Sequence, residues 1–382
     1  MIARIFFFLL IVLVTQCQQK RADDKVIENS SKYSTTKLAE VAFQKTSLKA
    51  EQIVIGSNDS TLISPHSGKA EYDYAYNEIN QMLIGQKPKD LKLAVFLVEN
   101  AYLEGKLDYS KYCQQLDTIK TAVKRIVKDK TNYQTDKLAY NYAIFNYMKE
   151  ASKYNNGRTY DYDFDDYLGL KDKRKVFVTK LLDTRKGNCH SLPMLYKILA
   201  NEMGVDAHLA IAPMHMYIKH LDYNNQWLNL ELTSADFPSD GHIMSESGIS
   251  IEAVKNEIYM HPMNEVQTIA YCILYLAQNY YRQYGAHDFV LEACNKSLEY
   301  YPELILAYLL KMQVYGTWLN SRSKVKGKSK SEIEYLKGLN KKLTALKNKV
   351  EKLGYKSITG EEYEQWQQQS DKQKLKELQA KN

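Results

Sequence analysis

The chain has 382 residues, of which 45% are hydrophobic and 25% charged, and its formal net charge is +7. This composition excludes a wholly disordered chain, a multi-span membrane protein and a disulfide-dense mini-protein, and the length suits about two or three domains. The charge is unevenly placed, because residues 321–382 hold 16 Lys or Arg against 8 Asp or Glu. The basic character therefore belongs to a C-terminal tail, and we expect no nucleic-acid partner because no recognised binding fold accompanies it.

Residues 1–17 have the form of a lipoprotein-type signal peptide. A short basic start precedes an apolar run over 5–15, which is too short to cross a membrane but has the size of a signal-peptide core. The stretch LVTQC at 13–17 resembles a bacterial lipobox, although Gln16 stands where a small residue is usual. This predicts export and lipidation at Cys17, with attachment to the bacterial cell envelope on its periplasmic face or on the cell surface. The alternative is a plain secretory signal or a short anchor.

The segment after the signal peptide is polar. Residues 18–60 lack a long apolar period, so they are predicted to be a flexible tether in which only 38–49 has the pattern of a short helix. The four cysteines beyond Cys17 are too few for a disulfide framework. Cys272 and Cys294 lie on apolar faces of predicted helices, and we expect them to be core residues rather than a bridge.

Residues 61–155 are predicted to be an N-terminal helical region. Apolar side chains recur at helical spacing over 91–103, 119–126 and 138–148. Residues 154–170 then alternate Asp with Tyr and contain Gly and Asn, which indicates a loop or short strand. A calcium loop is an alternative for this acidic stretch, but it lacks the regular spacing of such loops.

Residues 156–250 have a different pattern and are predicted to form the central α+β domain. Apolar residues at helical spacing predict a helix over 190–203 that ends at Gly204, and Pro193 fits only in its first turns. Cys189 is therefore expected at or just before the N-terminus of this helix. Strand-like runs follow at 207–212, 215–221 and 226–232.

The C-terminal part returns to helical periodicity. Tyr281 and Pro302 fall where a tetratricopeptide repeat has an aromatic residue and its closing proline, so 251–320 is predicted to be a tetratricopeptide-like helical region. Residues 321–382 are predicted to be a basic helical tail. The expected helices lie at 268–281, 289–300, 304–318, 331–353 and 360–379.

The central domain contains the three groups that a catalytic thiol needs. Cys189 at a helix N-terminus meets the positive end of the helix dipole, which favours the thiolate. His215 opens a predicted strand and would act as its base, and Glu231 on the next strand would orient the imidazole. A three-residue loop centred on Tyr223 would place residues 215 and 231 directly opposite each other, whereas a slip of one residue would move Glu231 to the other face.

These residues belong to a longer motif that resembles the core of the transglutaminase-like superfamily, whose members share a papain-like fold with a Cys-His-Asp arrangement. The resemblance covers about residues 160–245 and is closest to bacterial members with flanking helices like those predicted here. It implies a papain/transglutaminase-like α+β core with nucleophile Cys189, base His215 and orienting carboxylate Glu231, where Glu replaces the usual Asp. The motif residues are Gly187-Asn188-Cys189, Leu195-Tyr196, Leu199-Ala200, Gly204, Pro213-Met214-His215, Trp227, Glu231 and Thr233.

Other residues near the motif have weaker roles. Asn188, His190, Trp227 and Thr233 are expected to support the site or to line the substrate. Asp183 stands six residues before the thiol, where papain-like enzymes place a Gln, so the backbone N–H of Cys189 is the expected oxyanion donor. Asp236, Asp240 and His242 are expected in a polar rim loop. Arg185 with Lys186 either favours the thiolate or an acidic substrate, or forms a solvated turn.

No metal or cofactor is expected. Zinc binding by Cys189 and neighbouring histidines (His190, His208, His215 and His220) is an alternative, but no metal-ligand spacing supports it.

Two functional hypotheses follow. The first is a membrane-anchored thiol enzyme that performs acyl transfer or amide hydrolysis on a protein or peptide. The second is a catalytically inactive transglutaminase-like and tetratricopeptide-like scaffold that binds a protein partner at the cell envelope.

Overall fold

The computed structural model describes residues 67–130, 136, 138–324 and 327–357. Lipidation at Cys17, the tether over 18–60 and the helix expected over 360–379 lie outside these residues and stay predictions. Within the described residues, no helix is both long enough and apolar enough to cross a membrane.

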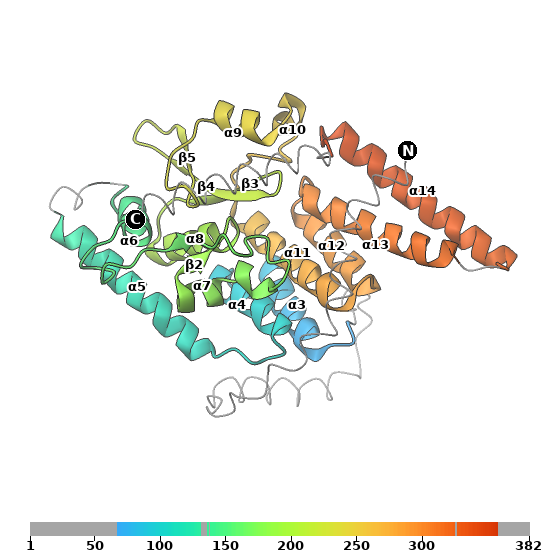
Figure 1. Cartoon of the computed structure of the whole chain (residues 1–382), viewed down its shortest axis with the longest axis horizontal. Helices are drawn as coiled ribbons and strands as arrows, with labels where there is room; N and C mark the ends of the chain where they lie inside the picture. Colours follow the sequence, from blue (N-terminus) through green and yellow to red (C-terminus); the bar gives the residue numbers. More distant parts are fainter. Residues whose placement is uncertain (1–66, 131–135, 137, 325–326, 358–382) are drawn as a thin grey trace.

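The protein is α+β, with helices building most of the described structure (Figure 1). Before the thiol region lie α3 (Ala70–Leu83), α4 (Leu91–Tyr102), α5 (Tyr109–Asp129) and α6 (Ala139–Lys149). After it lie α11 (Glu265–Tyr284), α12 (Asp288–Tyr300), α13 (Ile305–Ser323) and α14 (Lys330–Lys352). The helices predicted at these places are confirmed. Helix α5 is much longer than predicted because Asp108 caps it early, accepting hydrogen bonds from the N–H groups of Ser110 and Lys111.

Helix α11 lies at the centre of the helical part. A capping box between Asn264 and Gln267 fixes its start. It packs against α3, α4 and α12, so helices from both ends of the described chain meet on it (Figure 1). Buried apolar side chains from Tyr72 to Val350 form one continuous cluster. The N-terminal helices, the thiol region and the C-terminal helices therefore share one core.

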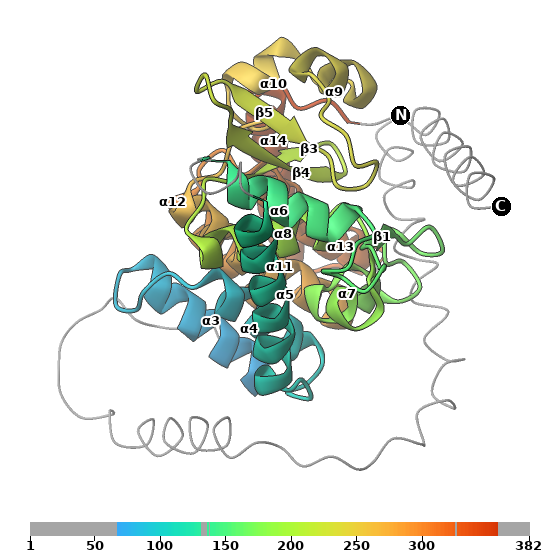
Figure 2. The same cartoon turned by 90° about the vertical axis from the view of Figure 1, so that its left-hand side faces the viewer.

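The thiol region combines short helices with two small sheets. Its helical elements are η3 (Lys173–Val176), α7 (Val178–Thr184) and α8 (Ser191–Met203). Strands β1 (Asp161–Tyr162) and β2 (Lys186–Gly187) pair in parallel, and β3 (His208–Ala212), β4 (His215–Leu221) and β5 (Trp227–Leu230) form an antiparallel sheet in that order. Figure 2 shows this sheet on one side of α8, with α9 (Asp240–Ser247) and α10 (Ile251–Lys255) beyond it. Gly204 ends α8 in the left-handed conformation, as predicted.

The β4–β5 hairpin differs from the predicted register. Leu221 pairs with Trp227, so the loop contains five residues rather than three and is centred on Asn224. The Asp222 side chain shapes this loop by accepting hydrogen bonds from the N–H groups of Asn224 and Gln226, at 2.8 Å each. The shift amounts to two residues along β5. Because side chains alternate with period two, Glu231 keeps its expected face and lies diagonal to His215 instead of opposite it.

The segment after β5 contains a second correction. Asp240 and His242 lie in helix α9, not in a polar loop, because Ser239 caps this helix by accepting a hydrogen bond from the His242 N–H. Residues farther along cover the free edge of β3, where the N–H groups of Met260 and Met263 donate to the carbonyls of Ile211 and Leu209 at 2.8 and 2.9 Å. This edge is therefore closed to other strands.

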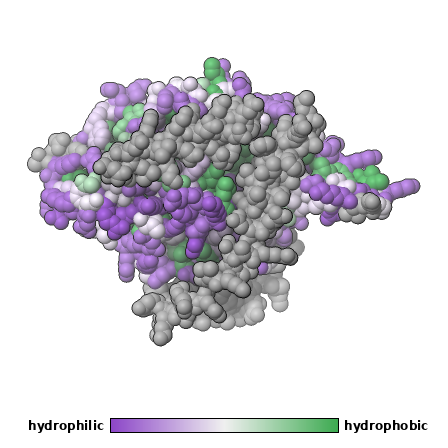
Figure 3. Space-filling view, in the orientation of Figure 1, coloured by the Kyte–Doolittle hydropathy of each residue, from purple (hydrophilic) through white to green (hydrophobic). Residues whose placement is uncertain are grey.

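The basic tail begins as a solvated helix. Helix α14 contains seven Lys and three Glu, and it packs against α13. On the face shown in Figure 3, hydrophilic residues cover most of the coloured surface and hydrophobic residues form small patches. The positive charge of this part of the chain is thus exposed and lies outside the thiol region.

Candidate thiol site

Cys189 lies at the N-terminus of α8, as the sequence predicts. The Asn188 side-chain oxygen accepts hydrogen bonds from the N–H groups of His190 and Ser191 at 3.0 and 3.1 Å. In return the Ser191 hydroxyl accepts from the Asn188 N–H at 3.1 Å, which completes a reciprocal cap. Asn188 is therefore a supporting residue that fixes the thiol at the positive end of the helix dipole.

Gly187 is required for this cap to form. A Cβ atom at this position would lie 2.5 Å from the Ser191 hydroxyl and 2.8 Å from a Leu181 methyl group. We expect Gly187→Ala to lower the free energy of unfolding by about 1–3 kcal/mol, through overpacking at the cap. Urea denaturation measures this change. Gly241→Ala is the control, because its added Cβ meets only the Ser239 hydroxyl at 4.0 Å; equal stability losses in both variants would contradict the prediction.

His215 stands at the first position of β4, beside the thiol. Its Nε2 atom pairs with the Glu231 carboxylate, and the ring also interacts with Cys189. The His215 side chain is 28% exposed. Burial lowers the pKa of His215, but the charge of Glu231 and the interactions with Cys189 and Glu231 outweigh it and raise the pKa well above 6.5. The imidazole is thus held in its protonated form next to the sulfur.

Glu231 follows β5 and is held at several points. Its backbone pairs with Asp236 through two hydrogen bonds of 2.9 and 3.1 Å. One carboxylate oxygen meets His215, and the other accepts from the N–H and the hydroxyl of Thr233, at 2.7 Å each. Burial raises the pKa of Glu231, but His215 and the Thr233 hydrogen bonds bring it below its ordinary value. Thr233 is therefore a supporting residue of the site, and Glu231 is a carboxylate at neutral pH.

The sulfur of Cys189 has a second neighbour. Its Sγ atom lies 3.7 Å from the Met214 carbonyl, at the tight turn between β3 and β4. Met214 adopts a left-handed φ of 57° and its side chain is exposed. The turn therefore brings both His215 and the Met214 carbonyl to the thiol.

His190 is a structural residue rather than a substrate-lining one. Its Nδ1 atom lies 3.0 Å from the Val176 carbonyl, and its ring packs 4.5 Å from the ring of Tyr275 on α11. Burial lowers the pKa of His190 to about 4, so it is neutral. Its buried Nε2 atom has no hydrogen-bond partner in the described chain. The side chain therefore packs into the core against α11.

Trp227 is not at the thiol. It begins β5, whereas Glu231 follows the end of that strand, so the two lie at opposite ends. The indole packs against His208 with ring centroids 5.4 Å apart. Trp227 has the spacing that the motif requires, but it supports the far end of the sheet and not the thiol.

The remaining predicted residues are placed as follows. Asp183 faces α5, where its carboxylate contacts Gln115 and Lys111 at 2.9 and 2.8 Å. Arg185 is in the left-handed conformation at the end of α7, and its guanidinium lies over the Tyr160 ring. Lys186 is exposed. Across the described ranges, no group of three His, Cys, Asp or Glu side chains could hold a metal ion.

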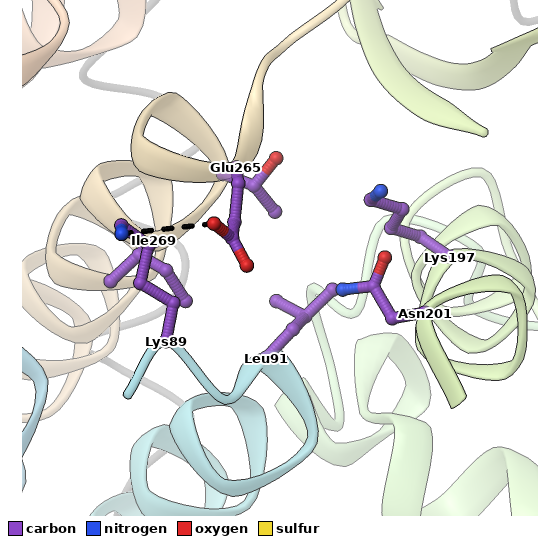
Figure 4. A pocket seen from close by; sticks show the side chains of 7 residues that line it. Lys89, Leu91, Lys197, Asn201, Glu265 and Ile269 are labelled. Atoms are coloured by element: carbon purple, nitrogen blue, oxygen red, sulfur yellow. Dashed lines mark ion pairs between the residues drawn. The ribbon is translucent and has the colours of Figure 1, made fainter. Parts of the chain in front are cut away.

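A small pocket elsewhere contains none of the predicted site residues (Figure 4). It lies between α4, α8 and α11, with Lys89 and Glu265 paired across it at 3.7 Å. Its lining residues are Lys89, Leu91, Lys197, Asn201, Glu265, Thr268 and Ile269.

No protein-family model, curated protein or solved structure gives a significant match to this chain. The resemblance to transglutaminase-like proteins therefore rests on the motif residues themselves and stays a prediction.

Proposed function

We propose that this protein is a thiol-dependent enzyme with a papain/transglutaminase-like core, which transfers or hydrolyses the acyl group of a protein or peptide amide. The observation that carries the proposal is the arrangement around one imidazole. The Glu231 carboxylate pairs with Nε2 of His215, and Cys189, at the capped N-terminus of α8, interacts with the same ring. This is the nucleophile, base and orienting group that covalent acyl transfer needs.

The reaction would proceed in two steps. Cys189 and the protonated His215 form a thiolate–imidazolium pair, and the thiolate sulfur attacks the carbonyl carbon of the substrate. The C–N bond then breaks as His215 returns the proton to the leaving amine, which leaves a thioester on Cys189. Water or a second amine attacks the thioester, its proton passes to the now neutral His215, and the C–S bond breaks to release the acyl product and restore the thiolate–imidazolium pair. Glu231 stays ionised throughout and stabilises the imidazolium.

The other described thiols provide an internal comparison. Burial raises the pKa of Cys272 and of Cys294 to about 12, so both are unreactive at neutral pH. Cys113 is half-buried and free, like Cys189. Cys113 lacks the helix cap and imidazole that accompany Cys189, which makes it the matched reference thiol.

We expect iodoacetamide at pH 7 to label Cys189 faster than Cys113, and His215→Ala to slow labelling of Cys189 by about 10-fold or more, because the base is lost. Peptide mass spectrometry after timed labelling gives both rates. His242→Ala is the control, since His242 is an exposed residue of α9. Equal labelling of Cys189 and Cys113, or unchanged labelling in His215→Ala, would refute the proposal.

A binding scaffold is the second candidate function. The hydrogen-bond geometry between Cys189 Sγ and the Met214 carbonyl suits a protonated thiol that serves only packing. In that case the stacked helices α11, α12 and α13 would hold a protein partner. A folded protein whose Cys189 shows no preferential labelling would favour this function.

We further propose that the protein is exported and attached to the bacterial cell envelope through a lipid on Cys17. Support comes from the apolar run and the LVTQC stretch at residues 13–17. The polar segment over 18–60 would then separate the folded part from the membrane surface.

A further inference from the structure

Tyr162 is held beside the thiol by strand pairing. In the parallel pair of β1 and β2, Tyr162 is the partner of Gly187, two residues before the thiol. The Asp163 N–H donates to the Gly187 carbonyl at 2.7 Å, which locks the two strands together next to Cys189. Residues 162 and 187 are 25 positions apart in the chain, so the position of Tyr162 beside the thiol depends on the pairing of β1 with β2.

The Tyr162 ring is held within an aromatic group that also supports the helix cap. Its neighbours are Phe164, with ring centroids 4.8 Å apart, and Tyr167, at 6.1 Å. The Tyr167 carbonyl accepts a hydrogen bond of 2.6 Å from the side-chain amide of Asn188. The segment that positions Tyr162 is therefore tied directly to the residue that caps α8.

The Tyr162 hydroxyl is a neutral donor in a region of negative charge. Burial raises the pKa of Tyr162 well above its ordinary value, and the charges of Cys189, Tyr167 and Glu231 raise it further. Within the described residues, this hydroxyl makes no hydrogen bond. It is thus a fully protonated O–H group in the electrostatic neighbourhood of the sulfur, with its donor free.

The helix cap leaves a second donor at the same place. The Asn188 side chain accepts hydrogen bonds from the N–H groups of His190 and Ser191 but not from that of Cys189. The Cys189 N–H also has no acceptor in the described part of the chain, as is usual for the first N–H groups of a helix. Asp183 cannot contribute a group to the thiol site, because its carboxylate is turned toward α5. The site therefore offers one backbone donor and one phenol.

We propose that Tyr162 is a catalytic residue whose O–H, together with the backbone N–H of Cys189, donates a hydrogen bond to the substrate carbonyl oxygen as it becomes negatively charged. The proposal rests on the function proposed above. When the sulfur attacks, the carbonyl π electrons move onto oxygen; when the amine leaves, they re-form the C=O bond. Tyr162 keeps its proton in both steps and stabilises only the intermediate.

The test compares two reagents on the full chain. The ester p-nitrophenyl acetate acylates a thiol through an oxyanion, whereas iodoacetamide alkylates it at a saturated carbon without one. We expect Tyr162→Phe to slow acylation of Cys189 by about 100-fold, the effect of removing one oxyanion donor, while alkylation changes by less than about 2-fold. Tyr160→Phe is the matched control, because its ring lies against Tyr147 and Arg185 instead of the thiol.

Each outcome has a distinct meaning. Unchanged acylation in Tyr162→Phe, with wild-type acylation intact, would overturn the role of Tyr162 alone. Equal losses in acylation and alkylation would also overturn it, because they indicate a structural role. Failure of the wild-type protein to acylate Cys189, shown by mass spectrometry, would overturn the proposed enzyme function itself.

Discussion

Replacing Glu231 by Gln should slow alkylation of Cys189 by about 10-fold at pH 6–7, because one pKa unit of His215 corresponds to a tenfold change in its protonation equilibrium. The carboxylate raises the pKa of His215 well above its ordinary value, and Gln carries no charge. Without the Glu231 carboxylate, the His215 imidazole binds the thiol proton more weakly. The thiolate then forms only at higher pH, so the rise of the labelling rate with pH should move toward alkaline pH.

The comparison variants make this result specific. Asp236→Asn removes a neighbouring exposed carboxylate while the backbone pairing with Glu231 remains, and its labelling profile should match the wild type. Glu231→Asp keeps the charge but shortens the side chain by one methylene. Because Glu231 lies diagonal to His215, Asp should give an intermediate rate. A Glu231→Gln profile that overlays the wild type would contradict the assigned role.

Replacing Glu99 by Ala should lower the free energy of unfolding by about 3 kcal/mol at pH 7, because buried donors would lose their acceptor. Glu99 on α4 is fully buried and accepts hydrogen bonds from the Val178 N–H and from the N–H and hydroxyl of Thr179. It therefore caps α7, the helix that precedes the thiol. Urea denaturation measures the loss. Glu104→Gln, at an exposed ion pair with Lys106, should change stability little.

Glu99 also predicts a pH dependence. Burial outweighs its hydrogen bonds and raises the pKa of Glu99 from 4.5 to about 7. The folded state therefore binds more protons than the unfolded state between these values, so the additional stability that comes from proton binding is complete below pH 4.5 and is lost as the pH rises to about 7. The hydrogen bonds from Val178 and Thr179 still stabilise the fold at pH 7. Glu99→Gln should remove this decline. A Gln variant whose stability has the wild-type slope over that range would disprove the assignment.

Local signals in the sequence predict much of the thiol region. The apolar period and Gly204 identify α8, and they place Cys189 at its start. The strand-like runs at 207–212 and 215–221 identify β3 and β4, which put His215 at the beginning of a strand. These features depend on neighbours in the chain, and they are confirmed.

Two kinds of feature could not be predicted, namely the detailed conformation of a loop and the contacts between segments far apart in the chain. The β4–β5 register follows from the Asp222 side chain and from Asn225, which adopts a left-handed φ of 58° in the loop. The face of Glu231 was nevertheless predicted, because a two-residue shift preserves it. The position of Tyr162 near the thiol was not predicted, because only the pairing of β1 with β2 brings it there. The alternation of Asp and Tyr over 161–163 was the sequence signal that could have drawn attention to Tyr162.

The bonds from Met260 and Met263 to β3 limit how this protein can be rearranged in evolution or by design. A gene fragment that encoded only residues 156–250 would lose the segment that closes the sheet edge, and it would also lose Tyr275, the aromatic support of His190. The exposed strand would then be available to pair with other copies. Moving the thiol region into another protein thus requires the residues through α11, which makes the transferable unit longer than the segment that contains Cys189, His215 and Glu231.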